Sequence, residues 1–177
     1  VDHLPRKGTS RHGHGMREKR EIEDLAPGTF TCWQMGGAGA VGGQTMTGMA
    51  ALHRLSERFR ADVCVWPFEH TDKPVVIAEV WPSLIASAVR KEGDTIKDRG
   101  QVRLLARALA ALEPADLADM LDVPDTDEGW ILGVGYEAKL NRAASASRVP
   151  PAFRNDCFAL PPGVDWTPVD DALARLR

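Results

Sequence analysis

Residues 75–81 read Val-Val-Ile-Ala-Glu-Val-Trp, and a run this apolar leaves the segment few structures to adopt. Short runs rich in β-branched residues are typical of strands that are buried on both faces of a sheet. Only Glu79 interrupts the run. Because a buried carboxylate is costly unless it is paired or binds a cation, we expect Glu79 to face a polar site or a partner.

The segments around this strand alternate between strand and helix patterns. We predict a short strand at 30–33 and a helix from about 46 to 60 whose apolar positions recur at helical spacing and form one buried face. Strands follow at 63–69 and 75–81, with a turn at 72–74 between them. Further helices are expected from Pro82, at 98–112, after Pro114 and at 127–144. This order of elements predicts an α/β fold with a mixed sheet.

The chain divides into three parts by composition. Residues 1–27 are predicted to form a basic arm or loop, 28–144 the α/β domain, and 145–177 a linker and tail rich in proline. Because the sequence begins with Val1 in such an arm, we expect it to start partway into a larger domain and to lack part of the sheet.

The overall composition narrows the function classes. With a net charge of -3, the protein has no overall positive field that would attract nucleic acid. Nucleic acid is therefore possible as a partner but not favoured. No apolar run is long enough for a membrane span. The 3 cysteines are odd in number and widely spaced, so a disulfide framework is not indicated and a cytoplasmic location is expected.

A glycine-rich segment precedes the first long helix and contains Gly37-x-Gly39-x-x-Gly42. Glycines between a strand and a helix allow a backbone to approach a phosphate, and the helix N-terminus offers unpaired N–H groups. These three glycines are candidate phosphate-binding residues. The alternative is that they serve close packing in a tight turn.

Two acids are candidate catalytic residues and magnesium ligands. Glu79 lies in a predicted central strand, and Asp98 begins a predicted helix. Carboxylates from such positions converge in sites that hold hard cations and activate water for phosphoryl displacement. Asp98 alone is explained equally well by the helix dipole. For Glu79 we expect a divalent ion, rather than a basic neighbour, to compensate the charge.

Several blocks of the sequence resemble alphaproteobacterial molybdopterin guanine dinucleotide synthesis proteins, which are related to predicted nucleases of ribonuclease H-like fold. The blocks are LPRK (4–7), FTCWQMGGAGAVG (30–42), VWPFE (65–69), AEVWPS (78–83), IKD (96–98) and EGWILG (128–133). The resemblance implies a ribonuclease H-like mixed sheet with flanking helices. In its metal site, Glu79 corresponds to the acid of a later strand and Asp98 to the acid of a helix, whereas the acid of the opening strand has no counterpart.

The tail carries a second resemblance. Residues 155–173 (NDCFALPPGVDWTPVDDAL) are similar to the start of molybdopterin molybdenumtransferases. Both resemblances imply a role in molybdenum cofactor biosynthesis, with a phosphorylated pterin or guanine nucleotide as ligand and other enzymes of that pathway as partners. A metal-dependent nuclease or phosphohydrolase of the same fold, and a non-catalytic interaction module, are the alternative hypotheses.

Overall fold

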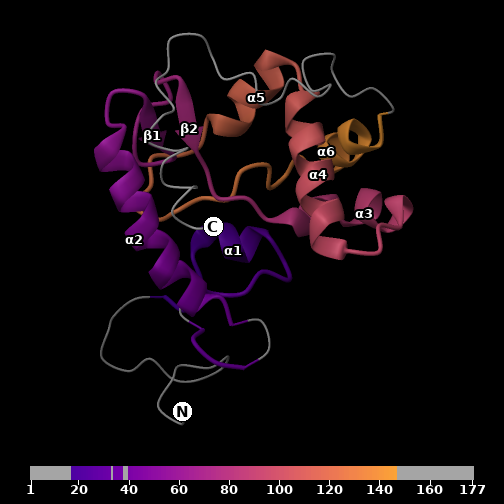
Figure 1. Ribbon diagram of the computed structural model, residues 1–177, viewed down its shortest axis with the longest axis horizontal. Coiled ribbons are helices and arrows are strands. Elements are labelled where there is room, and N and C mark those ends of the chain that lie inside the picture. The colour runs from indigo at the N-terminus through magenta and orange to yellow at the C-terminus, as the bar shows by residue number, and fades with distance from the viewer. Residues whose placement is uncertain (1–16, 33, 38–39, 147–177) are drawn as a thin grey trace, which may run out of the picture.

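The computed structural model describes residues 17–146, except 33 and 38–39. This part of the chain has the expected α/β character, with six α-helices, one 3₁₀ helix (η1) and a two-stranded sheet. In chain order the elements are α1 (Glu21–Leu25), α2 (Gly42–Arg58), β1 (Val63–Val65), β2 (Val75–Ile77), η1 (Pro82–Ile85), α3 (Ala86–Glu92), α4 (Lys97–Ala110), α5 (Pro114–Leu121) and α6 (Glu137–Ser145). Helix α2 lies at one side of the molecule and α3, α4 and α6 at the other (Figure 1).

The helices α3, α4 and α6 pack with η1 around a common core. Helix α4 is predicted from its apolar spacing, and the structure confirms it. Its buried face contains Leu104, Leu105 and Ala108, which follow the 3–4 residue spacing of one helix side. The apolar spacing of Val102, Leu105 and Leu109 predicts that Val102 shares this face, but Val102 is 68% exposed. The buried face of α4 is therefore rotated slightly from the one that the sequence suggests.

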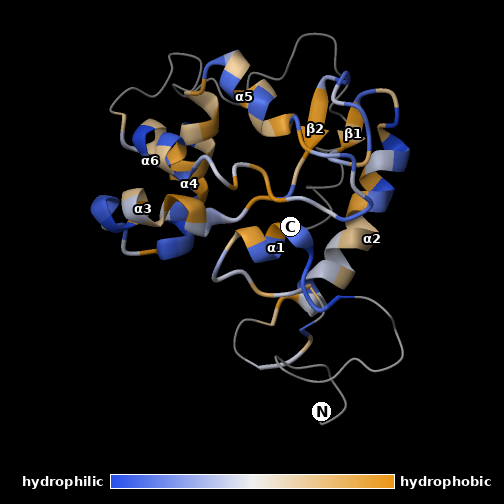
Figure 2. Cartoon of the chain, turned by 180° about the vertical axis from the view of Figure 1, so that it is seen from behind, coloured by the Kyte–Doolittle hydropathy of each residue, from blue (hydrophilic) through white to orange (hydrophobic). Residues whose placement is uncertain are grey.

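The sheet is smaller than predicted. Strands β1 and β2 pair in parallel, with Val63 opposite Val75 and Val65 opposite Ile77. The apolar character of both strands is visible in Figure 2. However, β2 is not buried on both faces, since Val75 is 46% exposed and Val80, just after it, is 43% exposed. The expectation of a doubly covered strand is wrong because only one face of this part of the chain meets the core.

Local hydrogen bonds occupy much of the outer edge of β1. The Val63 N–H donates to the carbonyl of Phe59, and the Val63 carbonyl accepts from Lys73 Nζ at 2.9 Å. The Val65 carbonyl accepts from the N–H of Glu69. A strand edge whose polar groups are already bonded is a poor template for a further strand. In the described residues, these bonds explain why β1 has no second neighbour.

Helix α2 forms where expected, but its predicted buried face is wrong. Met46 is 67% exposed, Met49 59% and Leu55 43%, and Gly42 is the only residue of α2 that is buried. The strand predicted before it is not present at residues 30–32, which have no regular structure. Among residues 17–146 that the structure describes, little therefore covers the apolar side of α2.

The last helix begins later than predicted. Residues 127–136 form turns and an extended segment, in which Ile131 makes a parallel bridge to Glu79, and α6 begins only at Glu137. Gly133 and Gly135 both have φ near +88°, a conformation that does not occur inside a right-handed helix. A Cβ atom at Gly133 would lie 2.7 Å from Leu140 Cδ1. Glycine is thus required for α6 to fold back onto this segment.

The predicted basic arm is partly helical. Its residues 21–25 form α1, in which Ile22 and Glu23 are each only 1% exposed. Residues 1–16 and the molybdenumtransferase-like segment lie outside the described residues. None of the helices in residues 17–146 combines the length and apolarity that crossing a bilayer requires.

Candidate functional site

A cleft of about 710 Å³ lies between α2 and the strand side of the molecule. This volume is in the range of small-molecule sites. The lining residues are Arg20, Thr29, Phe30, Cys32, Val41, Thr45, Gly48, Met49, Leu52, Val65, Trp66, Phe68, residues 77–81, Gly129, Trp130 and Ile131.

Among the described residues, five aromatic side chains contribute to the lining. Trp66 and Trp130 are 4% and 8% exposed, whereas Phe30 and Phe68 are 45% and 57% exposed. Trp81 is intermediate. Buried rings fix a surface, and exposed rings beside them offer apolar area that no part of the described chain covers. The cleft is therefore suited to a flat, mainly apolar group.

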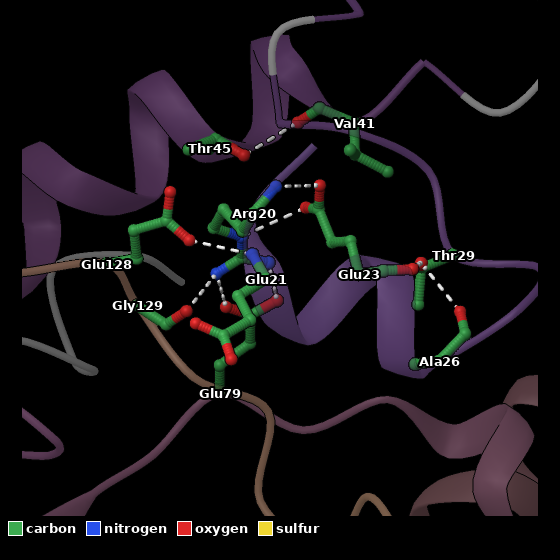
Figure 3. A network of polar contacts seen from close by, with 10 residues as sticks. All are labelled: Arg20, Glu21, Glu23, Ala26, Thr29, Val41, Thr45, Glu79, Glu128 and Gly129. Atoms are coloured by element: carbon green, nitrogen blue, oxygen red, sulfur yellow. Dashed lines mark hydrogen bonds and ion pairs between the residues drawn. The ribbon is translucent and has the colours of Figure 1, made fainter. Parts of the chain in front are cut away.

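The polar group of the cleft is an ion pair between Arg20 and Glu79. Arg20 Nη1 donates to Glu79 Oε2 at 2.7 Å, and Nη2 donates to Oε1 at 2.9 Å, which is a bidentate arrangement (Figure 3). Two parallel charge-assisted hydrogen bonds fix both the position and the plane of the carboxylate. The Arg20 side chain is 17% exposed and that of Glu79 is 47% exposed.

The guanidinium of Arg20 is held in turn from the other side. Its Nε donates to Glu23 Oε1 at 2.9 Å, and Nη1 also donates to the carbonyl of Gly129 at 3.1 Å. Glu23 is 1% exposed and caps α1 by accepting the backbone N–H of Arg20. The hydrogen bonds that Arg20 donates to Glu79 are the largest cause that raises the pKa of Arg20 above its ordinary value. The charge of Glu79 and the hydrogen bond and charge of Glu23 add to this rise, whereas burial opposes it. Arg20 thus joins α1, the end of β2 and the 128–129 segment.

This arrangement corrects the expectation for Glu79. Its charge is compensated by a basic neighbour, Arg20, and the prediction that a divalent ion does so is wrong. The physical premise also fails, because Glu79 lies beyond β2 with nearly half of its side chain exposed rather than inside a buried strand. Burial therefore gives no reason to place a metal ion there.

Asp98 does not join Glu79 in this site. It lies exposed in the first turn of α4 and is not among the residues that line the cleft. Within the described residues, no group of three or more His, Cys, Asp or Glu side chains is placed to hold a metal ion. Magnesium binding by Glu79 and Asp98 remains a prediction from the sequence, and the helix dipole accounts for Asp98.

The three candidate glycines have different positions. Gly39 lies outside the described residues. Gly37 has φ of +90°, so it turns the chain before α2. A Cβ atom at Gly42 would overlap the Met35 sulfur and lie 2.8 Å from the carbonyl oxygen of Cys32. At Gly42 the contacts are with this chain, as the close-packing alternative expects.

Three further residues of this network are not among the candidates from the sequence. Arg20 and Glu23 lie in the segment predicted as an arm, and Gly129 lies in the predicted last helix. One signal was available: Arg20 precedes Glu23 by three residues, the spacing of a capping interaction at a helix start. Nothing in the sequence shows that Arg20 meets Glu79, which is 59 positions away.

A second depression, of about 540 Å³, lies beside the cleft region at the surface. It is lined by Arg17, Glu21, Pro124, Asp125, Thr126, Asp127, Glu128 and Trp130. Glu128 accepts the backbone N–H of Glu21 at 2.7 Å, so this acid serves to hold α1. An acidic surface of this kind is most simply a solvated face.

Comparison of the chain with protein-family models, curated proteins and solved structures finds no match. The function must therefore be argued from the cleft and from the residues that line it.

Proposed function

We propose that this protein acts in molybdenum cofactor biosynthesis in the cytoplasm and binds the ring of a phosphorylated pterin or guanine nucleotide in the α2 cleft. The observation that carries the proposal is an aromatic cleft with one fixed carboxylate, Glu79, at its side. The pathway, and a ribonuclease H-like architecture around the small parallel sheet, rest on the resemblances of the sequence.

The dimensions and chemistry of the cleft support a ring as the bound part. Trp66, Trp81 and Trp130 line it together with Met49 and Leu52 of α2. Flat heterocycles gain from stacking on aromatic rings and from losing contact with water. Both pterin and guanine present such a ring, with polar atoms only at the edge.

The phosphate is better placed outside the aromatic part of the cleft. Arg20 is the only basic residue among the described residues that line it, and its guanidinium is already bonded to Glu79 and Glu23. Val41, the N-cap residue of α2, and Thr45, in its first turn, line the cleft, and a Cβ at Gly43 in the same turn would meet open space. A phosphate would thus lie near the N-terminus of α2, where the helix dipole favours an anion.

The proposed role is binding rather than catalysis. Glu79 was the acid expected to activate water, and each of its oxygens accepts a hydrogen bond from Arg20. A nuclease needs a positively charged surface to bind a polynucleotide. Within the part of the chain that the structure describes, Arg20 is the only basic residue in the lining of the cleft, and it is already paired with Glu79 and Glu23. No specific contact favours that hypothesis over ligand binding.

Isothermal titration calorimetry with GMP and with neopterin monophosphate tests the proposal. We expect saturable binding that Gly48→Leu weakens at least tenfold, since Gly48 lines the cleft and a Cβ there meets open space. Ala51→Leu is the matched control, because it adds a similar side chain at an exposed position of the same helix outside the lining. If neither ligand binds the parent protein, or if both variants bind equally well, the proposal is wrong.

Adding magnesium chloride to the same titrations tests the remaining magnesium prediction. A gain in affinity that is lost in Asp98→Asn would support it. Equal affinity with and without the cation would remove magnesium from the function of this cleft.

A further inference from the structure

We infer that Glu79, fixed by Arg20, recognises the exocyclic amino group at the ring edge of guanine or pterin. This inference rests on the proposed function and specifies which edge of the ring the cleft selects. It makes Glu79 the specificity-determining residue and Arg20 a positioning residue.

The carboxylate has unused hydrogen-bonding capacity. A carboxylate offers about four lone-pair sites. Arg20 uses one site on each oxygen, at 2.7 and 2.9 Å. The Glu79 side chain is 47% exposed and lines the cleft, so the other sites remain accessible. The free sites lie on the outer sides of the two oxygens, so the carboxylate can accept one further N–H group at either oxygen without leaving Arg20.

Arg20 lacks a corresponding capacity for anions. A guanidinium has five N–H donors. Four of them go to acceptors in this structure: Nε to Glu23, Nη1 to Glu79 and to the Gly129 carbonyl, and Nη2 to Glu79. One Nη2 hydrogen remains, so a phosphate could gain a single hydrogen bond from this group, and a bidentate contact only by displacing Glu79. The pair therefore presents an acceptor, not a cation, to a ligand.

The local charge favours the same choice. Arg20 contributes one positive charge, and Glu23 and Glu79 contribute two negative charges, so the three side chains carry one net negative charge. N–H groups of a polarised heterocycle are attracted to such an acceptor, whereas a ring nitrogen with a lone pair is repelled. The position is also rigid, because Glu23 is buried and holds Arg20 from behind. A rigid acceptor loses little entropy when the ligand binds.

Nucleotides that differ only at the ring edge test the inference. GMP has both donors, IMP lacks the amino group, and AMP presents a ring nitrogen without hydrogen in place of the ring N–H. Since a hydrogen bond to a charged acceptor contributes more than a neutral one, we expect GMP to bind the parent protein about tenfold more tightly than IMP. AMP carries its amino group at another ring position, so it should bind no more tightly than IMP. Pterin against lumazine, which lacks the amino group, gives the same comparison in the other ring system.

Three variants separate recognition from folding. Glu79→Gln keeps the size of the side chain but replaces one acceptor by a donor, so the preference for GMP over IMP should fall below about threefold. Arg20→Lys should reduce the preference partly, because an ammonium group does not fix the plane of a carboxylate. Glu69→Gln is the matched control: Glu69 also pairs with a cation, Lys73, at 43% exposure, but lies outside the cleft. It should keep the full preference, and thermal unfolding of each variant verifies that it is folded.

Each outcome has a defined meaning. Equal affinity of the parent protein for GMP and IMP, and for pterin and lumazine, overturns the inference but leaves the proposed function in place. A preference that survives in Glu79→Gln also overturns the inference. Absence of binding by all of these ligands overturns the proposed function itself.

Discussion

The helices α3, α4 and α6 bury their apolar side chains against one another, whereas α2 leaves most of its own exposed. In the first region Ile85, Ala108 and Leu140 are 0% exposed. In the second, Met46 and Met49 are 67% and 59% exposed, and the cleft separates α2 from much of the strand side. Stability thus comes mainly from the helical region, and the cleft region keeps apolar surface for a ligand.

Each region also contains a carboxylate held by arginine. In the helical region, Asp94 accepts from Arg99 Nη2 at 2.6 Å and from the N–H of Ile96 at 2.9 Å, and its side chain is 3% exposed. In the cleft region, Glu79 is held by Arg20 but is 47% exposed. Asp94 fixes the turn before α4, and Glu79 retains capacity for a ligand. The same pairing therefore serves structure in one region and recognition in the other.

The largest effect expected from this difference is on core packing. Leu140→Ala should lower the free energy of unfolding by about 3–5 kcal/mol, because Leu140 is fully buried and the shorter side chain leaves a cavity in the core. Met49→Ala should lower it by less than about 1 kcal/mol, because Met49 is largely exposed. Urea unfolding of both variants measures the two values. Equal losses would show that α2 contributes to the core as much as α6.

The second prediction concerns the link between α1 and the cleft. Arg20→Ala should lower the free energy of unfolding by about 2–4 kcal/mol, because it leaves the buried Glu23 without its charged partner. Arg60→Ala, which breaks an exposed pair with Glu57, should change it by less than about 1 kcal/mol. Urea unfolding again measures the effect. If the two variants lose the same stability, Arg20 does not hold α1 in place.

Regions dominated by local sequence signals were the most predictable. The helices at α4 and α5 follow from apolar spacing and from Pro114 at a first helical position, and both are confirmed. The final helix was extended too far because Trp130 and Ile131 fit a helical spacing, although the conformations of Gly133 and Gly135 end any such helix. Which side of α2 is covered depends on distant segments, and local periodicity carries no information about them.

The candidate site shows the same limit. The expectation that Glu79 faces a polar site or a partner is confirmed by its pair with Arg20, although the burial from which it was argued is not present. Its partner could not be inferred, because Arg20 reaches it from 59 positions away through the fold. The assumption that β2 extends to Trp81 also made Glu79 look more buried than its 47% exposure. Neither the burial of Glu79 nor its long-range pairing follows from the local sequence, because both depend on segments that are distant in the chain.

Two adjacent glycines at the start of α2 allow a packed position to be compared with an open one within the cleft region. Gly42→Ala should lower the free energy of unfolding by about 1–3 kcal/mol, because a Cβ there overlaps Met35 and the Cys32 carbonyl. Gly43→Ala should raise it by about 0.5 kcal/mol, because a Cβ there meets open space and alanine favours helix. Thermal or urea unfolding of the pair measures both signs. Similar effects at the two positions would contradict the packing assigned to Gly42.

The smallest expected effect is the pH dependence that Asp94 gives to the helical region. The hydrogen bond from Arg99, followed by that from the Ile96 N–H, lowers the pKa of Asp94 from 3.8 to about 2. A carboxylate with a lowered pKa in the folded state stabilises the protein above its unfolded pKa, and this stabilisation is lost as pH falls from about 4 to about 2. The difference in unfolding free energy between the parent protein and Asp94→Asn should therefore be constant above pH 5 and shrink below pH 4, at about the pKa of an unfolded aspartate. Arg99→Met should weaken this pH dependence, since it removes the largest cause of the lowered pKa of Asp94. If the difference in unfolding free energy between the parent protein and Asp94→Asn is the same at pH 5 and below pH 4, Asp94 has the same pKa in the folded and unfolded chains.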